Sequence, residues 1–355
     1  MDIRIQLEEM LQQIDAVRYA DSHQALRIAM EALELSKEHQ LGEQEAILLY
    51  KIGSIYINMS AYNKGMEYLT ACLPMLEMYN QTYHICSTYN TLGIAFFDQA
   101  YYDTSFMYYT ESAKLAKQYH YQDRLSIAYN NIGEIYKFLG DYTKALQFYQ
   151  LSLDEDVYNN YIGRGVTFIN MAEIYYQLDD NNKALEFAAI GYKELQYRGT
   201  ELLYCEAYKV YALIYWRLGN LEEAEDQFQK AIDMAEVKLS YYYKTEILIH
   251  YQQFLMEQKR LEEALEALRE AYRLADQNKL HEKCILICKA FIRIFEALDQ
   301  EHEAIIYYRL YMHHDQELSK IRMKQTGESI EMRVKADESK IQSEIDPLTG
   351  IPNRR

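Results

Sequence analysis

The chain is poor in the residues that interrupt helices. Its 355 residues include only 13 glycines and 3 prolines, which is too few to supply the turns of an α/β or all-β fold. Long apolar runs are lacking as well. No stretch approaches the ~20 residues that a membrane span needs, and the most apolar one, 284–295, is broken by Lys289 and Arg293. We therefore predict an all-α fold with no membrane partner.

Basic charge and paired cysteines are also scarce. The formal net charge of −17 repels nucleic acid, which needs a basic surface to replace its counterions, so nucleic acid is not an expected partner. The five cysteines form no Cys-x-x-Cys pair and are odd in number, so we predict that they are reduced and buried. The N-terminus lacks the basic start and apolar core of a signal peptide. A cytoplasmic location is therefore expected.

Catalytic and metal-binding motifs are lacking too. The chain has no phosphate loop, no His-Glu-x-x-His and no Gly-x-Ser-x-Gly, so we predict no catalytic residue and no cofactor for these residues alone. His281, Cys284 and Cys288 would share one face of a helix, but no second ligand pair follows them in the sequence. We therefore predict no metal site. His313 and His314 are adjacent, and on a helix they point in different directions.

What the chain does have is a repeat of forty residues. A small residue recurs at spacings of 40, 40, 39 and 40, and an aromatic residue stands three positions after each one. The pairs are Gly53 and Tyr56, Gly93 and Phe96, Gly133 and Tyr136, Ala172 and Tyr175, and Ala212 and Tyr215. The pattern resembles tetratricopeptide repeats, in which the small residue lets the second helix of each pair cross closely and the aromatic fills the space beside it.

This resemblance implies a right-handed α-solenoid of about eight repeats over residues 1–315, with degenerate outer repeats that act as caps. The repeat is longer than the usual tetratricopeptide unit of about 34 residues, so each unit gains between one and two helical turns. Peptide-pheromone receptors of Gram-positive bacteria have similarly long repeats. The Tyr-Asn-x-x-Gly-x-x-aromatic strings at 89–96 and 129–136 are similar to theirs.

In such a solenoid the first helix of each repeat lines the concave surface, and the residues beside the packing positions face inward. Those that we predict to line a ligand groove are Asn90, Asn130, Asn131, Glu134, Lys137, Asn170, Lys209 and Arg217. An asparagine side chain both donates and accepts hydrogen bonds, which suits an extended peptide backbone. Alternatively, the asparagines bond to the neighbouring helix. The basic residues would meet a peptide carboxylate or an acidic partner, or would only balance local charge.

Residues 316–345 are charged and contain one glycine, Gly327, so we predict that they continue as a connector helix with a weak point there. Met323, Ile330, Val334 and Ile341 follow a 7-4-7 spacing, which makes one narrow apolar seam. A seam of this kind favours a homodimer that pairs through the connector and switches between two arrangements with a small energy gap.

The last ten residues resemble the Asp-x-Leu-Thr-Gly-x-x-Asn-Arg-Arg segment that opens GGDEF diguanylate cyclase domains. The match comprises Asp346, Leu348, Thr349, Gly350, Asn353, Arg354 and Arg355. It implies a sensor for a C-terminal enzyme that makes cyclic di-GMP and whose Mg²⁺ and GTP sites lie outside these 355 residues. Ligand in the groove would change the curvature of the solenoid and reset the connector. The alternative is a stand-alone tetratricopeptide scaffold or peptide receptor whose tail matches by chance.

Overall fold

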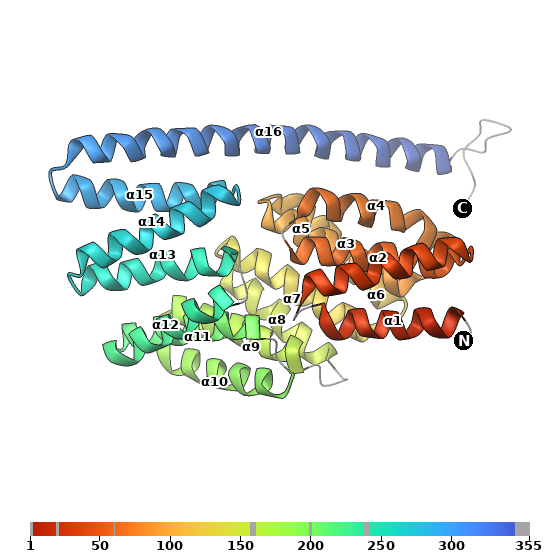
Figure 1. Ribbon diagram of the computed structural model, residues 1–355, viewed down its shortest axis with the longest axis horizontal. Helices are drawn as coiled ribbons and strands as arrows, with labels where there is room; N and C mark the ends of the chain where they lie inside the picture. The colour runs from red at the N-terminus through yellow and green to blue at the C-terminus, as the bar shows by residue number, and fades with distance from the viewer. Residues whose placement is uncertain are drawn as a thin grey trace. The chain divides into compact units, whose positions relative to one another are not determined.

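The computed structural model describes residues 3–18, 21–59, 61–156, 161–198, 201–237 and 241–344, without the side chains of 161–162, 197–198, 201–202, 237, 325–326 and 328–344. Over these residues the chain is all-α, as predicted, and comprises sixteen helices (Figure 1). They are α1 (Ile3–Val17), α2 (Ser22–Glu38), α3 (Gly42–Asn58), α4 (Tyr62–Met78), α5 (Thr82–Asp98), α6 (Tyr102–Gln118), α7 (Gln122–Phe138), α8 (Tyr142–Glu155), α9 (Tyr161–Gln177), α10 (Asn181–Arg198), α11 (Glu201–Arg217), α12 (Leu221–Val237), α13 (Tyr241–Glu257), α14 (Leu261–Gln277), α15 (His281–Ala297) and α16 (Glu301–Glu344).

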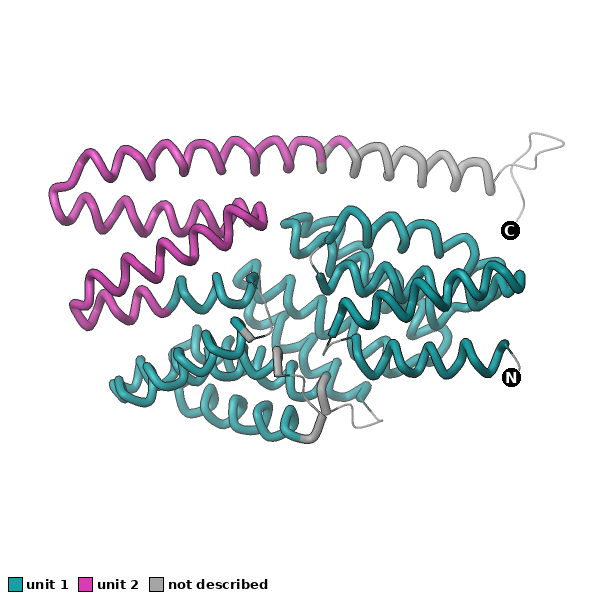
Figure 2. Tube along the Cα trace, in the orientation of Figure 1, with its two compact units in different colours: residues 1–250 teal, residues 251–355 magenta. Residues whose placement is uncertain are grey.

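The helices form two compact units, residues 1–250 and 251–355, and the division falls inside α13 (Figure 2). We call them unit 1 and unit 2. The boundary that the sequence predicts at 315/316, between the solenoid and the connector, falls within α16, and it stays a prediction. None of the helices in the described ranges combines the length and the apolar character of a membrane-spanning segment.

The turns explain why the repeat is forty residues long. Most helices are 17 residues long, and three residues join each to the next. In the first such turn Gln40 is left-handed, with φ +53°. Its N–H bonds the carbonyl of Lys37 while the N–H of Leu41 bonds that of Ser36, at 3.1 and 2.8 Å, which is a Schellman motif. The repeat is therefore two helices and two turns of this kind.

The same turn recurs along the described chain at spacings of about twenty or forty residues. Left-handed residues stand at Asn80, Ala100, His120, Gly140, Asp179, Gly219, Lys259, Lys279 and Asp299. Only two of these are glycines, the residue that adopts a positive φ without steric cost. The two backbone hydrogen bonds of the Schellman motif hold the other residues in this conformation.

Within a repeat, the small residues allow close helix contact, as predicted. A Cβ built on Gly93 would lie 2.4 Å from a ring carbon of Tyr109 on α6, and the Gly93 carbonyl accepts a hydrogen bond from the Ser105 hydroxyl at 2.8 Å. Gly133 meets the ring of Tyr149 in the same way, at 2.6 Å. Ala172 and Ala212, at the equivalent positions, are fully buried. Helix pairing therefore leaves no room for a larger residue at these positions.

Four of the five packing aromatics stack on a second ring twelve residues later, on the paired helix. The ring centroids of Phe96 and Tyr108 lie 5.4 Å apart at an interplanar angle of 6°, which is an offset-stacked geometry. The equivalent pairs are Tyr56 with Tyr68, Tyr136 with Phe148, and Tyr175 with Phe187. Tyr215 has Gln227 at the matching position and stacks instead on Tyr211 of its own helix.

We predict that Gly93→Ala lowers the free energy of unfolding by about 1–3 kcal/mol, because the added methyl group overlaps a buried tyrosine ring. Urea unfolding followed by circular dichroism measures the loss. Gly327→Ala is the control, since a Cβ there would meet no atom within 4 Å and alanine is the better helix former. Equal stability of the Gly93→Ala variant and the wild type would contradict the close-contact argument.

Candidate ligand-binding surface

The inner surface of unit 1 is formed by the first helices of successive repeats. Helices α3, α5, α7, α9 and α11 each contact the next helix of this series. In a stacked solenoid the more closely spaced layer lies on the inside of the curve. The residues that the sequence predicts to line a groove lie on α5, α7, α9 and α11, so they belong to this layer.

Three of the predicted asparagines are joined in a chain of hydrogen bonds across the inner layer. Asn131 Nδ2 donates to Asn90 Oδ1 at 2.8 Å, from α7 to α5, and Asn130 Nδ2 donates to Asn131 Oδ1 at 3.3 Å. The Thr167 hydroxyl on α9 lies 3.0 Å from Asn130 Oδ1. These bonds are the contacts between neighbouring helices that the alternative interpretation of the sequence expects.

Two amide groups remain for a ligand. The chain of bonds is directional and ends on Asn90 Oδ1, which leaves the Asn90 amide N–H groups at its terminus. Asn170 is half-buried on α9, and among the described residues its side chain has no hydrogen-bond partner. Asn90 therefore offers donors, and Asn170 offers both donors and an acceptor.

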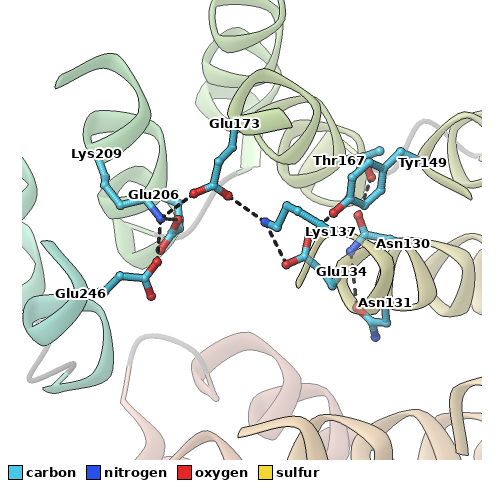
Figure 3. A network of polar contacts seen from close by, with 10 residues as sticks. All are labelled: Asn130, Asn131, Glu134, Lys137, Tyr149, Thr167, Glu173, Glu206, Lys209 and Glu246. Carbon is cyan, nitrogen blue, oxygen red and sulfur yellow. Dashed lines mark hydrogen bonds and ion pairs between the residues drawn. The ribbon is translucent and has the colours of Figure 1, made fainter. Parts of the chain in front are cut away.

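A network of charged side chains continues across the inner layer (Figure 3). Lys209 on α11 is 1% exposed and lies 2.6 Å from Glu206, 2.9 Å from Glu246 and 3.3 Å from Glu173. Glu173 on α9 also pairs with Lys137 on α7, at 2.7 Å. The network thus joins α7, α9, α11 and α13 through alternating charges.

Glu134 connects the charged network to the helix pair α7 and α8. Its carboxylate lies 3.1 Å from Lys137 Nζ and accepts a hydrogen bond from the hydroxyl of Tyr149, the ring that covers Gly133 (Figure 3). The carboxylate is therefore held from two sides, and it fixes the position of Lys137.

Arg217 lies apart from this network, in contrast to the inward basic cluster that the sequence suggests. It donates to Asp179 at 2.8 Å and to the backbone carbonyl of Tyr176. Its guanidinium carbon lies 3.6 Å from the centre of the Tyr176 ring. Arg217 therefore fastens the end of α11 to the turn after α9. Lys137 and Lys209 are each engaged by glutamates, so the interpretation that they balance local charge agrees with the geometry.

Four residues of this surface were not predicted from the sequence, namely Thr167, Glu173, Glu206 and Glu246. A signal for three of them is present, because bonded pairs across the inner layer are separated by about one repeat. Lys137 and Glu173 are 36 residues apart, and both Thr167 with Asn130 and Lys209 with Glu246 are 37 apart. The predicted segment Asp346 to Arg355 lies outside the described residues. The seam residues Ile330, Val334 and Ile341 lie in α16, but their side chains are not described.

Comparison with known proteins supports the fold. Models of the tetratricopeptide repeat match residues 46–73, 83–154, 125–189 and 163–236, which together make up just over half of the chain. The chain is a tetratricopeptide repeat protein. No curated protein matches this tetratricopeptide repeat protein significantly.

Several solved structures are similar to this tetratricopeptide repeat protein. A Rap protein complexed with Competence and Sporulation Factor is 14% identical, with a TM-score of 0.67 over 90% of this chain and 87% of that one. The Rap conjugation gene regulator of plasmid pLS20, in complex with the Phr* peptide, is 15% identical, with a TM-score of 0.66 over 78% and 76%. NprR in complex with its cognate peptide NprX is 19% identical, with a TM-score of 0.59 over 88% of each chain. At these identities the similarity establishes the fold.

In this tetratricopeptide repeat protein, two glutamates of the network have pKa values that are shifted in opposite directions. Burial alone would raise the pKa of Glu173, but Lys137 and Lys209 outweigh it and lower the pKa to about 2. Glu206 differs, because burial, together with Glu246 and Glu173, raises its pKa despite Lys209. When all are ionised, the four carboxylates labelled in Figure 3 carry two charges more than the two ammonium groups. These six groups are therefore acidic as a set.

We predict that Lys209→Met lowers the free energy of unfolding at pH 7 by roughly 3–5 kcal/mol, since three glutamates would then face one another without their buried cation. Urea unfolding measures the loss. The control is Lys230→Met, which removes an exposed lysine that pairs with Asp226 and should change stability by less than about 1 kcal/mol.

Acidification should reduce the difference in the free energy of unfolding between the Lys209→Met variant and the wild type. In the wild type the folded pKa of Glu173 is about 2, below the unfolded value of about 4.3. Its contribution is therefore complete above pH ~4.3 and is lost as the pH falls towards 2. In the variant the glutamates gain protons at higher pH, which relieves their repulsion. A difference that is the same at pH 7 and pH 4 would exclude this electrostatic origin.

Proposed function

We propose that this protein binds an extended peptide or protein segment on the inner surface of unit 1. The observation that carries the proposal is a polar layer made of two bonded groups, the asparagine chain from α5 to α9 and the charged network from α7 to α13. Helix pairing within each repeat is already provided by the small residues and stacked rings. Buried ion pairs are weak contributors to stability compared with apolar packing, so a layer of them on the concave side is better explained by recognition.

The two amide groups give the surface the chemistry that a peptide backbone requires. Asn90 offers N–H groups to peptide carbonyls, and Asn170 can bond to both groups of one peptide unit. Such contacts do not depend on the ligand's side chains, so they suit any extended segment. Specificity would then come from the neighbouring charges.

The acidic network favours a ligand that carries positive charge at this point. Because Lys137 and Lys209 are held by glutamates, they are poor partners for a peptide carboxylate. The excess of glutamate, and the net charge of −17 on the whole chain, would attract a basic side chain or a free amino terminus. The proposed ligand is therefore a basic or amino-terminal peptide segment.

The similar structures support this proposal through their fold. The pLS20 Rap regulator was solved with the Phr* peptide and NprR with its peptide NprX. Proteins with the same fold can have different functions, so the proposal depends on the residues of the inner surface of this chain. The stand-alone peptide receptor is the interpretation that these similarities favour.

The proposal predicts that Asn90→Ala combined with Asn170→Ala weakens peptide binding by about tenfold or more, because each lost hydrogen bond is worth roughly 1 kcal/mol. The probe is a fluorescein-labelled peptide selected from a random hexapeptide library on the purified full chain, and fluorescence anisotropy measures its affinity. Asn63→Ala, on the exposed side of α4, is the matched control. Failure to select any peptide, or equal affinity of the double variant and the control, would overturn the proposal.

A second, finer proposal concerns the output. The resemblance of residues 346–355 to the opening of GGDEF domains, together with the continuous helix α16 that leads towards it, favours a sensor that regulates a diguanylate cyclase. Reading the native coding sequence past codon 355 tests this. We expect an open frame with a Gly-Gly-(Asp or Glu)-Glu-Phe string, whereas a stop codon at that point would leave the peptide receptor alone.

A further inference from the structure

A cluster of possible metal ligands lies in unit 2, where three helices meet. Asp276 is in the last turn of α14, Cys284 is in the first turn of α15, and His314 is in α16. Each offers one ligand atom, and these atoms all lie within 4.8 Å of one another. Cys284 is fully buried and His314 is 1% exposed, whereas Asp276 is exposed. The cluster is therefore open to solvent on one side only.

The turn between α14 and α15 brings the first two ligands together. Lys279 takes the left-handed conformation there, with φ +56°, so the chain reverses within three residues and α15 begins at His281. His314 comes from a distant part of the sequence and is placed by α16, which contacts α15. This arrangement differs from the one considered in the sequence analysis, because Asp276 and His314 provide the ligands from outside α15.

The donor set suits zinc. Thiolate sulfur, imidazole nitrogen and carboxylate oxygen are the ligands that Zn²⁺ takes from proteins at about 2.0–2.3 Å, which holds the ligand atoms roughly 3.3–3.8 Å apart. His314 Nε2 already lies 3.8 Å from Asp276 Oδ1. A thiolate and a carboxylate also neutralise the two charges of the ion. Small side-chain rotations would therefore complete three of its four positions.

The other ring nitrogen of His314 has a hydrogen-bond partner that would orient the ring for metal binding. Its Nδ1 lies 3.1 Å from Nδ1 of His281, so an N–H on Nδ1 can donate to His281 while Nε2 faces the ligand atoms. Metal-bound histidines usually have this kind of orienting partner on the other ring nitrogen. The Tyr272 hydroxyl is 2.9 Å from Nε2. A metal ion on Nε2 would replace this contact and leave the hydroxyl to bond a water molecule in the fourth position.

The remaining requirement of the site is a thiolate at Cys284. Cys284 is a free, buried cysteine, and it binds zinc only after it loses its thiol proton, because the thiolate is the metal ligand. Binding of a metal ion would release this proton to solvent.

We propose that Asp276, Cys284 and His314 form a zinc site that ties α14, α15 and α16 together. Binding at this point fixes the start of the long helix α16 against the helix pair before it. The site is independent of the peptide surface, since all of its residues belong to unit 2, and neither proposal needs the other.

Metal binding by the untagged full chain tests the proposal. After treatment with a chelator and gel filtration, the protein is titrated with Co²⁺ and then with Zn²⁺. We expect one ion per chain, a thiolate-to-cobalt charge-transfer band in the near ultraviolet, and displacement of cobalt by zinc. Cys284→Ser should abolish the band, and Asp276→Asn should weaken binding at least tenfold. Because Asp276 is exposed, its variant should fold normally.

Cys288→Ser is the matched control, since Cys288 is a buried cysteine one turn further along α15 and is not one of the three proposed ligands. It should retain both the band and the stoichiometry. At the same zinc concentration, zinc should also raise the melting temperature of the wild type more than that of Asp276→Asn. Binding that is substoichiometric, or that is the same in Cys284→Ser as in the wild type, would overturn the proposal. Loss of the band in Cys288→Ser but not in Cys284→Ser would do so as well.

Discussion

The architecture depends on how closely the two helices of each repeat approach one another. Where Gly53 and Gly65 meet, a Cβ on either residue would lie about 3.0 Å from the carbonyl oxygen of the other, so the two backbones are nearly in contact. The stacked rings lie beside this crossing point in four of the repeats. Because protein interiors are close-packed and resist changes of volume, each crossing tolerates only small residues.

The polar groups follow the same register as the packing. Across unit 1, hydrogen bonds and ion pairs join residues that are separated by about one repeat, from Lys51 with Asp15 to Lys209 with Glu246. The same holds inside unit 2 for Tyr272 with His314, 42 residues apart. Packing within a repeat is thus mainly apolar, whereas neighbouring repeats are joined by many specific polar pairs. A ligand that competes for these pairs would act directly on the contacts between repeats.

The fold was predictable because its main constraint is local. A small residue and an aromatic three positions later fix where two helices cross, and both can be found by comparing the sequence with itself. The stacking partners Tyr68, Tyr108, Phe148 and Phe187 were not predicted, because their positions depend on the three-residue turn that sets the second helix. The polar layer was predictable only in part. Asn90 and Asn170 lie on the expected layer, but the glutamates that neutralise Lys209 come from three helices and require the three-dimensional register. For the same reason, the contact between His314 and Cys284 was not predicted, because it forms only when α16 packs against α15.

The spacing of the turns has a consequence for how such a chain can change in evolution. In the described residues, left-handed residues stand both in turns from a first to a second helix, as at Ala100, and in turns between repeats, as at His120, so the two kinds of turn have the same form. Duplication or deletion of forty residues would keep every remaining helix in its layer. A change of twenty residues would preserve good turns as well, yet it would exchange the inner and outer roles of all helices after it. Duplications and deletions in this chain should therefore comprise whole repeats of forty residues. Those of a single helix and its turn are excluded.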